Sequence, residues 1–300
     1  MRSIPTQLLL RLAITLLSSN VIAAQSNGNN GNRLLESGKA EKLIEPSATS
    51  ELKIVSYNIR WRSGEELQQI IRWLKATDNG PAPAIIGLQE VDRAKKRSGR
   101  VNHAKAIAES LGMYYAWAGP HANKETPEEE TGVQILSSYP LTDVTRIVLP
   151  HPGPGGRLRV ALGATTQIGR TRVRVYSVHS EIRLAMNKKV GQLRAVLDDL
   201  QKFPKDMPAI VLGDFNAWEL PAIEDIRELF TNAGFTTPLP DDESTFTTRA
   251  LMFDVKLKLD WIWLRGLAPQ SYGIDRKLRV SDHFLLWTVI KSNNPDKAPH

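Results

Sequence analysis

The sequence feature that most constrains the fold of this chain is a repeated pattern in which an apolar run ends abruptly at a polar side chain. Residues 84–89 form a nearly continuous apolar run that ends at Glu90, and residues 209–212 form another that reaches Asp214 after one glycine, with Asn216 two positions on. Runs this short and this apolar are typical of strands buried on both faces of a sheet. The pattern therefore predicts a covered sheet with polar groups at its strand ends.

Other predicted strands carry polar side chains at equivalent positions. Strands predicted at 52–57 and 171–178 stop at Asn58 and His179, and two later strands are preceded by polar residues, namely Asp260, Asp282 and His283. In a sheet of mixed direction, the start of an antiparallel strand lies at the same edge as the end of its neighbour. Taken singly, each residue is explained as well by a turn or a solvated strand end. Together they predict one edge that holds them all.

This edge would concentrate four carboxylates, which repel one another unless a cation or a histidinium lies among them: Glu90, Asp214, Asp260 and Asp282. Oxygen donors dominate the set, and the chain has no cysteine and no His-Glu-x-x-His spacing. Such donors favour Mg²⁺ or Mn²⁺ over zinc. A hard divalent cation together with carboxylates and two imidazoles can promote the attack of water on a phosphate ester.

Length and composition fit one large or two small soluble domains. The 300 residues are 41% hydrophobic and 24% charged, which is ample chain for a buried core. Apolar residues recur with helical spacing at residues 65–75, 102–111, 188–200 and 221–230. The sequence has no internal repeat and no second domain boundary, so we expect a single domain over residues 51–292.

The N-terminus has the pattern of a secretory signal peptide. Arg2 gives a positive start, residues 8–17 are mostly apolar, and small residues precede a cleavage site after position 23. A retained membrane anchor is the rival interpretation, but the apolar stretch is shorter than the ~20 residues that a span needs. We expect residues 1–23 to be removed, residues 24–50 to form a flexible linker, residues 293–300 to form a polar tail, and the product to be periplasmic or secreted.

The mature chain is moderately basic. Two of the 39 basic residues, Arg2 and Arg11, lie in the leader, so 37 basic residues remain against 32 acidic ones and the net charge is +5. This excess favours anionic partners without identifying them. Because cysteine is absent, an exported product would rely on its core and on metal rather than on disulfides.

Six short segments stand out together, and they lie at residues 56–60, 88–92, 177–179, 213–216, 259–262 and 281–283. In sequence and order they resemble the motifs of the endonuclease/exonuclease/phosphatase superfamily, which includes deoxyribonuclease-like nucleases, sphingomyelinases and inositol-polyphosphate phosphatases. Any one segment is a weak signal, whereas six in order are a strong one. The resemblance implies an α/β (α+β) fold, a four-layer αββα sandwich of two mixed β-sheets flanked by helices.

The resemblance also implies a role for each polar residue. Glu90 is similar to the family's metal-binding glutamate, Asn58 to a residue that assists metal or phosphate, and Asp282 to an additional metal or structural carboxylate. His179 resembles a histidine that contacts the phosphate, and its usual acidic partner corresponds to Glu130. The implied cofactor is Mg²⁺ or Mn²⁺.

The same resemblance assigns the catalytic roles. Asp214 is similar to the aspartate that aligns or activates the nucleophilic water, and Asn216 to its phosphate-binding partner. His283 resembles the essential histidine near the scissile phosphate, which Asp260 polarises. One departure is Asp92, which replaces the lysine of abasic-site nucleases and argues against a DNA-repair enzyme.

We therefore expect an exported divalent-metal-dependent phosphoesterase, more specifically a phosphodiesterase that acts on nucleic acid or on a phosphorylated lipid headgroup. The alternative is a non-catalytic binding module on the same fold for anionic polymers or membrane surfaces. A nuclease would bind through its basic surface with an affinity that falls as salt rises. A lipid headgroup enzyme would need an exposed apolar lip beside the site. No obligate protein partner is evident, and we expect a monomer.

Overall fold

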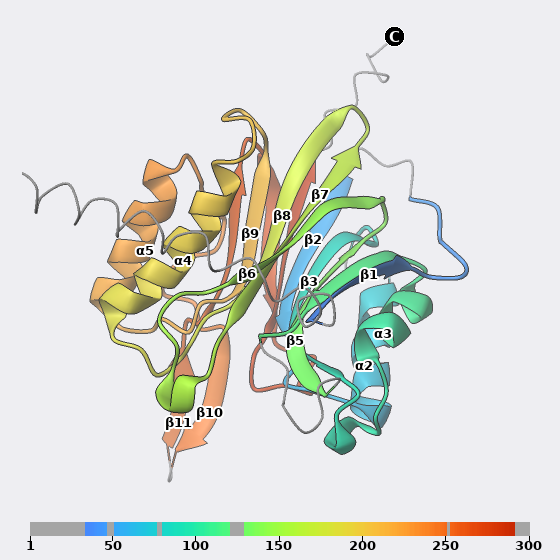
Figure 1. Ribbon diagram of the computed structural model, residues 1–300, viewed down its shortest axis with the longest axis horizontal. Coiled ribbons are helices and arrows are strands. Elements are labelled where there is room, and N and C mark those ends of the chain that lie inside the picture. The colour runs from blue at the N-terminus through green and yellow to red at the C-terminus, as the bar shows by residue number, and fades with distance from the viewer. Residues whose placement is uncertain (1–33, 47–50, 77–79, 121–128, 251–252, 292–300) are drawn as a thin grey trace, which may run out of the picture.

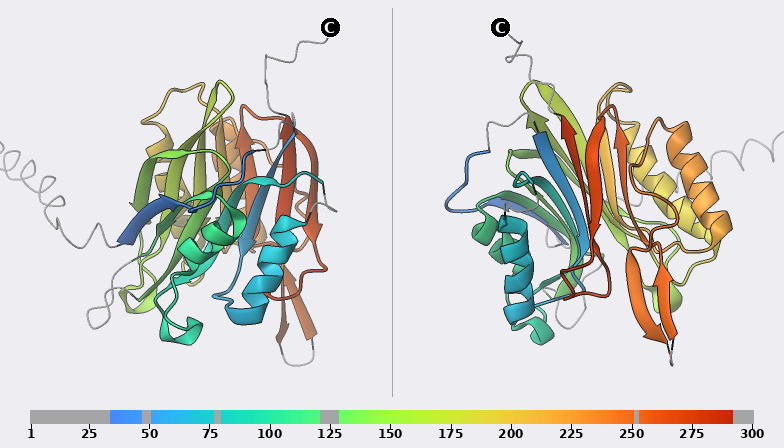
Figure 2. Two further views of the ribbon diagram at one scale, coloured as in Figure 1. Left: turned by 90° about the vertical axis from the view of Figure 1, so that its right-hand side faces the viewer. Right: turned by 180° about the vertical axis from the view of Figure 1, so that it is seen from behind.

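The computed structural model describes residues 34–46, 51–76, 80–120, 129–250 and 253–291. In this part of the chain two β-sheets pack face to face, and helices cover their outer faces (Figures 1 and 2). The four-layer αββα sandwich expected from the sequence is thereby confirmed.

Both sheets are mixed, because each contains one parallel pair among antiparallel ones. The seven-stranded sheet has the order β1 (Leu35–Lys39), β4 (Tyr114–Ala118), β5 (Glu130–Ser137), β3 (Pro83–Arg93), β2 (Glu51–Asn58), β14 (Leu285–Lys291) and β13 (Pro269–Asp275). The five-stranded sheet has the order β12 (Asp260–Arg265), β9 (Ala209–Asp214), β8 (Thr171–His179), β7 (Val160–Ile168) and β6 (Leu141–Val148). The parallel pairs are β2 with β3 and β8 with β9.

The helices lie on the two outer faces, as Figure 2 shows in its right-hand view. Helices α2 (Gly64–Lys75) and α3 (His103–Leu111) cover the seven-stranded sheet, and α4 (Met186–Leu200) and α5 (Leu220–Asn232) cover the five-stranded sheet. Each helix buries one apolar stripe; in α2 it consists of Leu67, Ile70, Ile71 and Leu74. Two short 3₁₀ helices, η2 (Lys96–Ser98) and η3 (Pro154–Gly156), lie in loops.

The core between the sheets is tightest just below the edge where the polar residues were expected. A Cβ atom on Gly87 of β3 would lie 1.9 Å from Leu212 Cδ1 of β9, so only glycine permits this approach. Beside this contact, Gln89 Nε2 donates a hydrogen bond to Ser177 Oγ at 3.1 Å. The two sheets are thus fixed to each other directly beneath that edge.

Strand register brings the predicted polar residues to one edge. His179 at the end of β8 lies opposite Asp214 at the end of β9, and Asp214 lies opposite Asp260 at the start of β12. In the other sheet, Asn58 at the end of β2 lies opposite Gln89, next to Glu90. The expectation of one shared edge is confirmed.

Three segments differ from the sequence prediction. The linker expected over residues 24–50 is wrong for its second half, because β1 pairs with β4 along five residues. Strand β13 and the hairpin of β10 (Phe246–Ala250) and β11 (Phe253–Leu257) were not expected; β13 pairs with β14, and β10 pairs with β11.

The predicted signal peptide at residues 1–23 and the predicted tail at residues 293–300 lie outside the described residues. None of the helices in the described part of the chain is both long and apolar enough to span a membrane.

We predict that Gly213→Ala destabilises the protein far more than Gly169→Ala. Gly213 has a φ of 135°, and a Cβ atom there would lie 2.1 Å from the Val178 carbonyl oxygen. Backbone strain and overpacking together should cost roughly 2–6 kcal/mol in the free energy of unfolding. Gly169→Ala should lower the free energy of unfolding by only about 1–2 kcal/mol, because Gly169 has a φ of 59° and open space around it. Urea unfolding measures both, and equal losses would contradict this account of the β8–β9 pair.

Candidate active site

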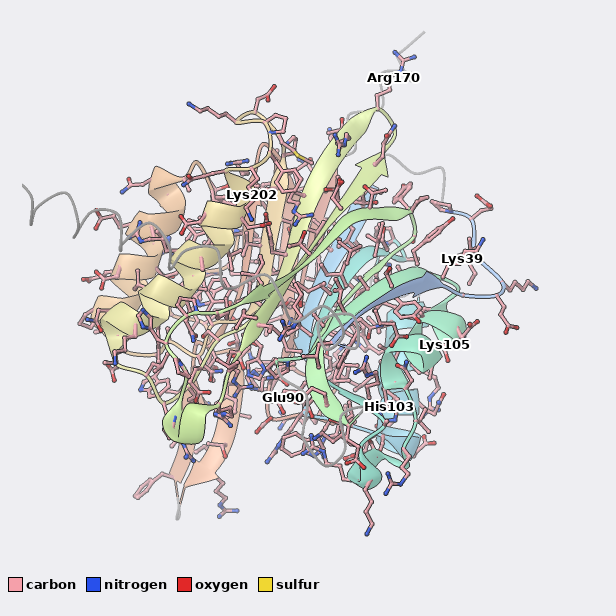
Figure 3. All side chains as sticks on the ribbon, in the orientation of Figure 1. Lys39, Glu90, His103, Lys105, Arg170 and Lys202 are labelled. Carbon is pink, nitrogen blue, oxygen red and sulfur yellow. The ribbon has the colours of Figure 1, made fainter. Side chains whose placement is uncertain are left out.

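Glu90 reaches the site through a β-bulge. The pairing of β3 with β5 shifts between Gln89 and Val91, so Glu90 is the extra residue, and its φ of 57° is left-handed. A bulge re-aims the side chain of its strand, and the Trp61 N–H fixes the conformation by donating to the Glu90 carbonyl at 2.9 Å. Glu90 lies between the two sheets at the lower edge of the sandwich (Figure 3).

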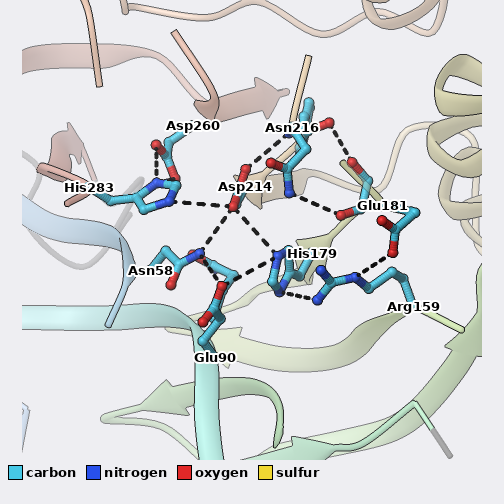
Figure 4. Close-up of polar contacts among 12 residues, drawn as sticks. Asn58, Glu90, Arg159, His179, Glu181, Asp214, Asn216, Asp260 and His283 are labelled. Atoms are coloured by element: carbon cyan, nitrogen blue, oxygen red, sulfur yellow. Dashed lines mark hydrogen bonds and ion pairs between the residues drawn. The ribbon is translucent and has the colours of Figure 1, made fainter. Parts of the chain in front are cut away.

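Asn58 connects the carboxylates of the two sheets. Its Nδ2 donates to Asp214 Oδ2 at 3.0 Å and to Glu90 Oε1 at 3.3 Å (Figure 4). Its Oδ1 accepts from the Arg60 N–H at 3.0 Å, which fixes the orientation of the amide. The structure therefore turns the nitrogen of Asn58, not its oxygen, toward the acids, so Asn58 supports Glu90 and Asp214 by hydrogen bonding.

His283 and Asp260 form a buried pair on the other side of Asp214. His283 Nδ1 lies 2.9 Å from Asp260 Oδ2, and Thr245 Oγ1 donates to the same carboxylate at 2.8 Å. His283 Nε2 lies 3.7 Å from Asp214 Oδ2. Because Asp260 accepts a hydrogen bond from Nδ1–H of His283, the other ring nitrogen, Nε2, faces Asp214. This is the arrangement expected for a histidine polarised by an aspartate.

The protonation of Asp214 and His283 is set by burial and by their mutual charges. Burial is the largest influence on the pKa of Asp214 and raises it to about 7, and the Asp260 carboxylate adds to the rise. Burial alone lowers the pKa of His283, but the carboxylates of Asp260 and Asp214 outweigh it and raise the pKa to about 10. His283 is therefore a cation at neutral pH, beside an aspartate that holds its proton unusually well.

His179 contacts both sheets and has a partner that the sequence did not predict. Its Nε2 lies 3.6 Å from Asp214 Oδ2 and 3.8 Å from Glu90 Oε1. Its Nδ1 lies 3.2 Å from Arg159 Nη1, so the acidic partner expected at Glu130 is corrected to an arginine. Burial, followed by the charge of Arg159, holds the pKa of His179 well below its usual value. His179 is a neutral imidazole.

Asn216 fixes the orientation of Asp214. Its backbone N–H donates to Asp214 Oδ1 at 3.0 Å, and its Nδ2 donates to the Ser180 carbonyl at 3.0 Å. The φ of Asn216 is 50°, a left-handed conformation that asparagine tolerates better than most residues. One Asp214 oxygen is therefore held by Asn216, and the other faces Asn58, His179 and His283.

A comparison of this sequence with protein-family models identifies the family to which the chain belongs. The model of the Endonuclease/Exonuclease/phosphatase family matches residues 55–283, which span every residue of the site. The chain belongs to this family. It is accordingly a metal-dependent phosphoester hydrolase, and the resemblance seen in the sequence is confirmed. A comparison with curated protein sequences finds no match.

Solved structures of family members share the fold. An endonuclease/exonuclease/phosphatase family protein from Leptotrichia buccalis is 19% identical, with a TM-score of 0.61 over 80% of this chain and 99% of that one. TDP2 from D. rerio, complexed with a single-strand DNA product, is 17% identical, with a TM-score of 0.62 over 81% and 100%. A mannosyl-6-phosphatase from Bacteroides thetaiotaomicron is 16% identical, with a TM-score of 0.58 over 79% and 98%.

The residues of this family member fit a divalent cation. Within the described residues, donor atoms of Asp214, Asp260 and His283 lie within 4.8 Å of one another. Asp260 Oδ2 and His283 Nδ1, however, already form a hydrogen bond with each other at 2.9 Å. Glu90 Oε1 and Asp214 Oδ2 instead both accept from the amide nitrogen of Asn58, at 3.3 and 3.0 Å, so two carboxylates of the two sheets converge on one group. Paired carboxylates are the hard oxygen donors that such a cation prefers.

Asp282 lies apart from that carboxylate pair. Its Oδ2 lies 3.0 Å from Arg60 Nη1, and its Oδ1 accepts from Ser281 Oγ at 3.3 Å. Its charge raises the pKa of His283 together with the closer acids. A role of Asp282 in metal binding stays a prediction.

Sequence reasoning missed Arg159 and Glu181 at this site. Arg159 Nε donates to the buried carboxylate of Glu181 at 3.2 Å. The sequence offered only a spacing, because Arg157 and Arg159 lie two residues apart just before β7 and Glu181 follows His179 by two residues.

We predict a bell-shaped dependence of kcat/KM on pH. Activity should rise as Asp214 loses its proton around pH 7, and a bound cation would shift this limb to lower pH. It should fall as His283 loses its proton near pH 10. In Asp260→Asn the alkaline limb should move to lower pH, because the main charge that raises the pKa of His283 is gone. The same substitution at the exposed Asp198 should leave both limbs in place, and an unmoved alkaline limb in Asp260→Asn would refute the assignment.

Proposed function

We propose that this family member is an exported phosphodiesterase that uses Mg²⁺ or Mn²⁺. The observation that carries the proposal is the single network of contacts around Asp214, which joins Asn58, His179, Asn216 and His283. The signal-peptide pattern of residues 1–23 supports export. The site is complete within one chain, which supports a monomeric enzyme.

Glu90 and Asp214 would supply carboxylate oxygens to the cation, with Asn58 keeping the two side chains in place. The cation, when bound, supplies positive charge that offsets the charge of the phosphate. Oxygen ligands and the absence of cysteine support Mg²⁺ or Mn²⁺ rather than a softer metal.

Asp214 directs the attacking water. Its Oδ1 is fixed by the Asn216 N–H, so Oδ2 has a defined direction from which to accept a hydrogen bond from water. The oxygen of that water forms the new bond to phosphorus, and the bond from phosphorus to the leaving oxygen breaks in line. Asp214 accepts the proton that the water loses.

Two imidazoles and an amide face the charge that develops on the phosphate. His283, held as a cation by Asp260, donates through Nε2 and supplies the proton that the leaving oxygen takes up. His179, held neutral, donates through Nε2 without carrying a charge. The second N–H of the Asn216 side-chain amide, whose nitrogen also donates to the Ser180 carbonyl, would add a further donor at the same strand end.

The non-catalytic alternative requires that the chemistry be lost while the fold is kept. In this structure the acid, the amide and both imidazoles form one network, with no member replaced or turned away. Family membership and this network together support the enzyme.

A nucleic acid is one substrate that the observations support. The TDP2 structure with a similar fold holds a single-strand DNA product. The net charge of +5 expected for the mature chain favours a polyanion. A lipid headgroup is the second candidate, and one specific feature favours it.

That feature is a hairpin beside the site with a phenylalanine exposed at its tip. Phe246 at the root of β10 packs edge-on against the His283 ring, with centroids 4.9 Å apart. From there β10 and β11 project out of the sandwich (Figures 1 and 2). Five residues at about 3.3 Å each carry the hairpin roughly 16 Å outward. Phe253, at the outer end of β11, is 73% exposed. An exposed aromatic side chain at the tip of a hairpin that begins beside the site supports a lipid headgroup as the substrate.

We predict that Asp214→Ala and His283→Ala each lower turnover of an activated bis(nitrophenyl) phosphate diester by roughly 10²–10⁴-fold. The physical reason is the loss of the water-directing acid or of the cationic His283 donor to the charge that develops on the phosphate. Steady-state hydrolysis with Mg²⁺, with Mn²⁺ and with chelator is the measurement, and chelator should abolish turnover by the unaltered enzyme. Asp198→Ala and His151→Ala, at exposed positions, serve as matched controls. Retained activity in either site variant, with a folded circular dichroism spectrum, would overturn the assignment.

We predict that Phe253→Ser selectively weakens hydrolysis of choline phospholipids in vesicles. Burying a phenylalanine contributes about 1.5–3 kcal/mol, so vesicle activity should fall roughly tenfold or more. Activity on the soluble diester should be unchanged, because Phe253 lies at the far end of the hairpin. Leu220→Ser, at a residue that is 75% exposed on α5, is the control. An equal loss in both variants, or activity on DNA alone, would favour the nuclease.

A further inference from the structure

The hydrogen bond between Arg159 and His179 has a fixed direction. Arg159 Nη1 lies 3.2 Å from His179 Nδ1. A guanidinium group has five N–H donors and no acceptor, so Nδ1 must be the acceptor and carries a lone pair. The ring proton of a neutral His179 is therefore on Nε2. An acidic partner, as expected at Glu130, would have required the opposite arrangement, with a proton on Nδ1.

The Nε2–H of His179 points into the space between the acids of the two sheets. It lies 3.6 Å from Asp214 Oδ2 and 3.8 Å from Glu90 Oε1, too far for a direct hydrogen bond to either. The donor is buried, and in the proposed function its acceptor is an oxygen of the phosphate that lies beside the cation. A phosphate oxygen there would give this N–H the acceptor that the protein does not provide.

Arg159 is itself held by a buried acid. Glu181, whose side chain is fully buried, accepts from Arg159 Nε at 3.2 Å. It also accepts from Arg157 Nε at 2.9 Å and Nη2 at 2.7 Å, and from the Arg183 N–H at 3.1 Å. A buried carboxylate with four donors is an anchor, so the guanidinium of Arg159 cannot move freely away from His179.

The surroundings of Glu181 are built to keep it there. Its N–H donates to Gln192 Oε1 at 2.8 Å, and Gln192 Nε2 donates to the Pro150 carbonyl at 2.8 Å, which connects α4 to the loop before η3. In that loop a Cβ atom on Gly153 would lie 2.6 Å from Glu181 Cδ. The loop therefore closes over the carboxylate at van der Waals contact, and solvent is kept from the anchor.

We propose that Arg159 is a positioning residue, which fixes the ring of His179 so that Nε2–H is presented to the phosphate. This inference rests on the proposed function for the identity of the ligand, but the assignment of the ring proton rests on geometry alone. His179 then acts as a neutral donor to the substrate, neither a base nor a cation. Glu181 acts through Arg159 and contacts no substrate.

Three substitutions of Arg159 separate hydrogen-bond direction from packing. Lysine keeps a side chain that only donates, methionine keeps the length without a donor, and glutamine offers both a donor and an acceptor. Arg172→Met, at an exposed ion pair on the opposite end of β8, is the matched control. The His179 ring signals are assigned by their loss in His179→Gln. The readouts are the ¹⁵N chemical shifts of that ring in the full chain, and kcat and KM for the activated diester.

The proposal expects Nδ1 of His179 to be unprotonated and hydrogen-bonded in the unaltered chain and in Arg159→Lys. In the Met and Gln variants the Nδ1 signal should shift, and kcat should fall roughly 10–100-fold, the usual effect of removing a partner that orients a histidine. Arg159→Lys should recover most of that loss. KM should change less than kcat, because the donor acts most strongly on the charge of the transition state.

Two results would overturn the proposal. One is a protonated Nδ1 in the unaltered chain, and the other is an Arg159→Met variant whose ring spectrum and kcat match those of Arg172→Met. If the unaltered chain hydrolyses no phosphate ester at all, the proposed function fails, and the ring spectra still decide for or against the position of the proton.

Discussion

The carboxylate of Asp214 is buried among other acids, and the rest of the structure depends on how that charge is offset. An isolated buried carboxylate is costly, and close like charges raise the cost further. Here the backbone of Asn216, the amide of Asn58 and the cationic ring of His283 each provide part of the compensation. The pKa of Asp214 nevertheless remains raised to about 7, so the compensation is incomplete without a further positive charge. In the proposed function a divalent cation beside Glu90 would complete it, and the same charge is what a phosphate ester needs for attack.

Much of this arrangement could be predicted from the sequence, because strand period and strand ends are local properties. Apolar runs that stop at Asn58 and Asp214 fix where β2 and β9 end, and the mixed direction of the sheets makes these ends meet. The run that stops at Glu90 marks a bulge instead, because β3 continues to Arg93. Helices α2 and α4 could be predicted in the same way, because the apolar residues of each recur with the spacing that places them on one face of a helix. The outline of the sandwich and the identity of the central acids and imidazoles were therefore within reach, and the structure confirms that they lie at one edge.

Other features depend on contacts that no local pattern encodes. The bulge that gives Glu90 a left-handed conformation arises from its pairing with β5, and the pairing of β1 with β4 joins segments far apart in the chain. The partner of His179 could not be chosen either, because a charged residue before a strand looks the same whether it meets solvent or an imidazole. Arg159 becomes meaningful only when the buried Glu181 is seen to hold it. The hairpin was missed because apolar and polar residues alternate only weakly along β11 and neither face of that strand is buried.

The measurement that tests the central claim most directly is a crystal structure of the protein grown with Mn²⁺, with anomalous scattering used to locate the metal. We expect one strong anomalous peak in contact with the carboxylate of Glu90 and next to Asp214, with Asn58 still donating to the acids. The peak should disappear in Glu90→Gln. A peak elsewhere, or occupied density that leaves Glu90 uninvolved, would contradict the account, since the charge of Asp214 would then be offset by some other means.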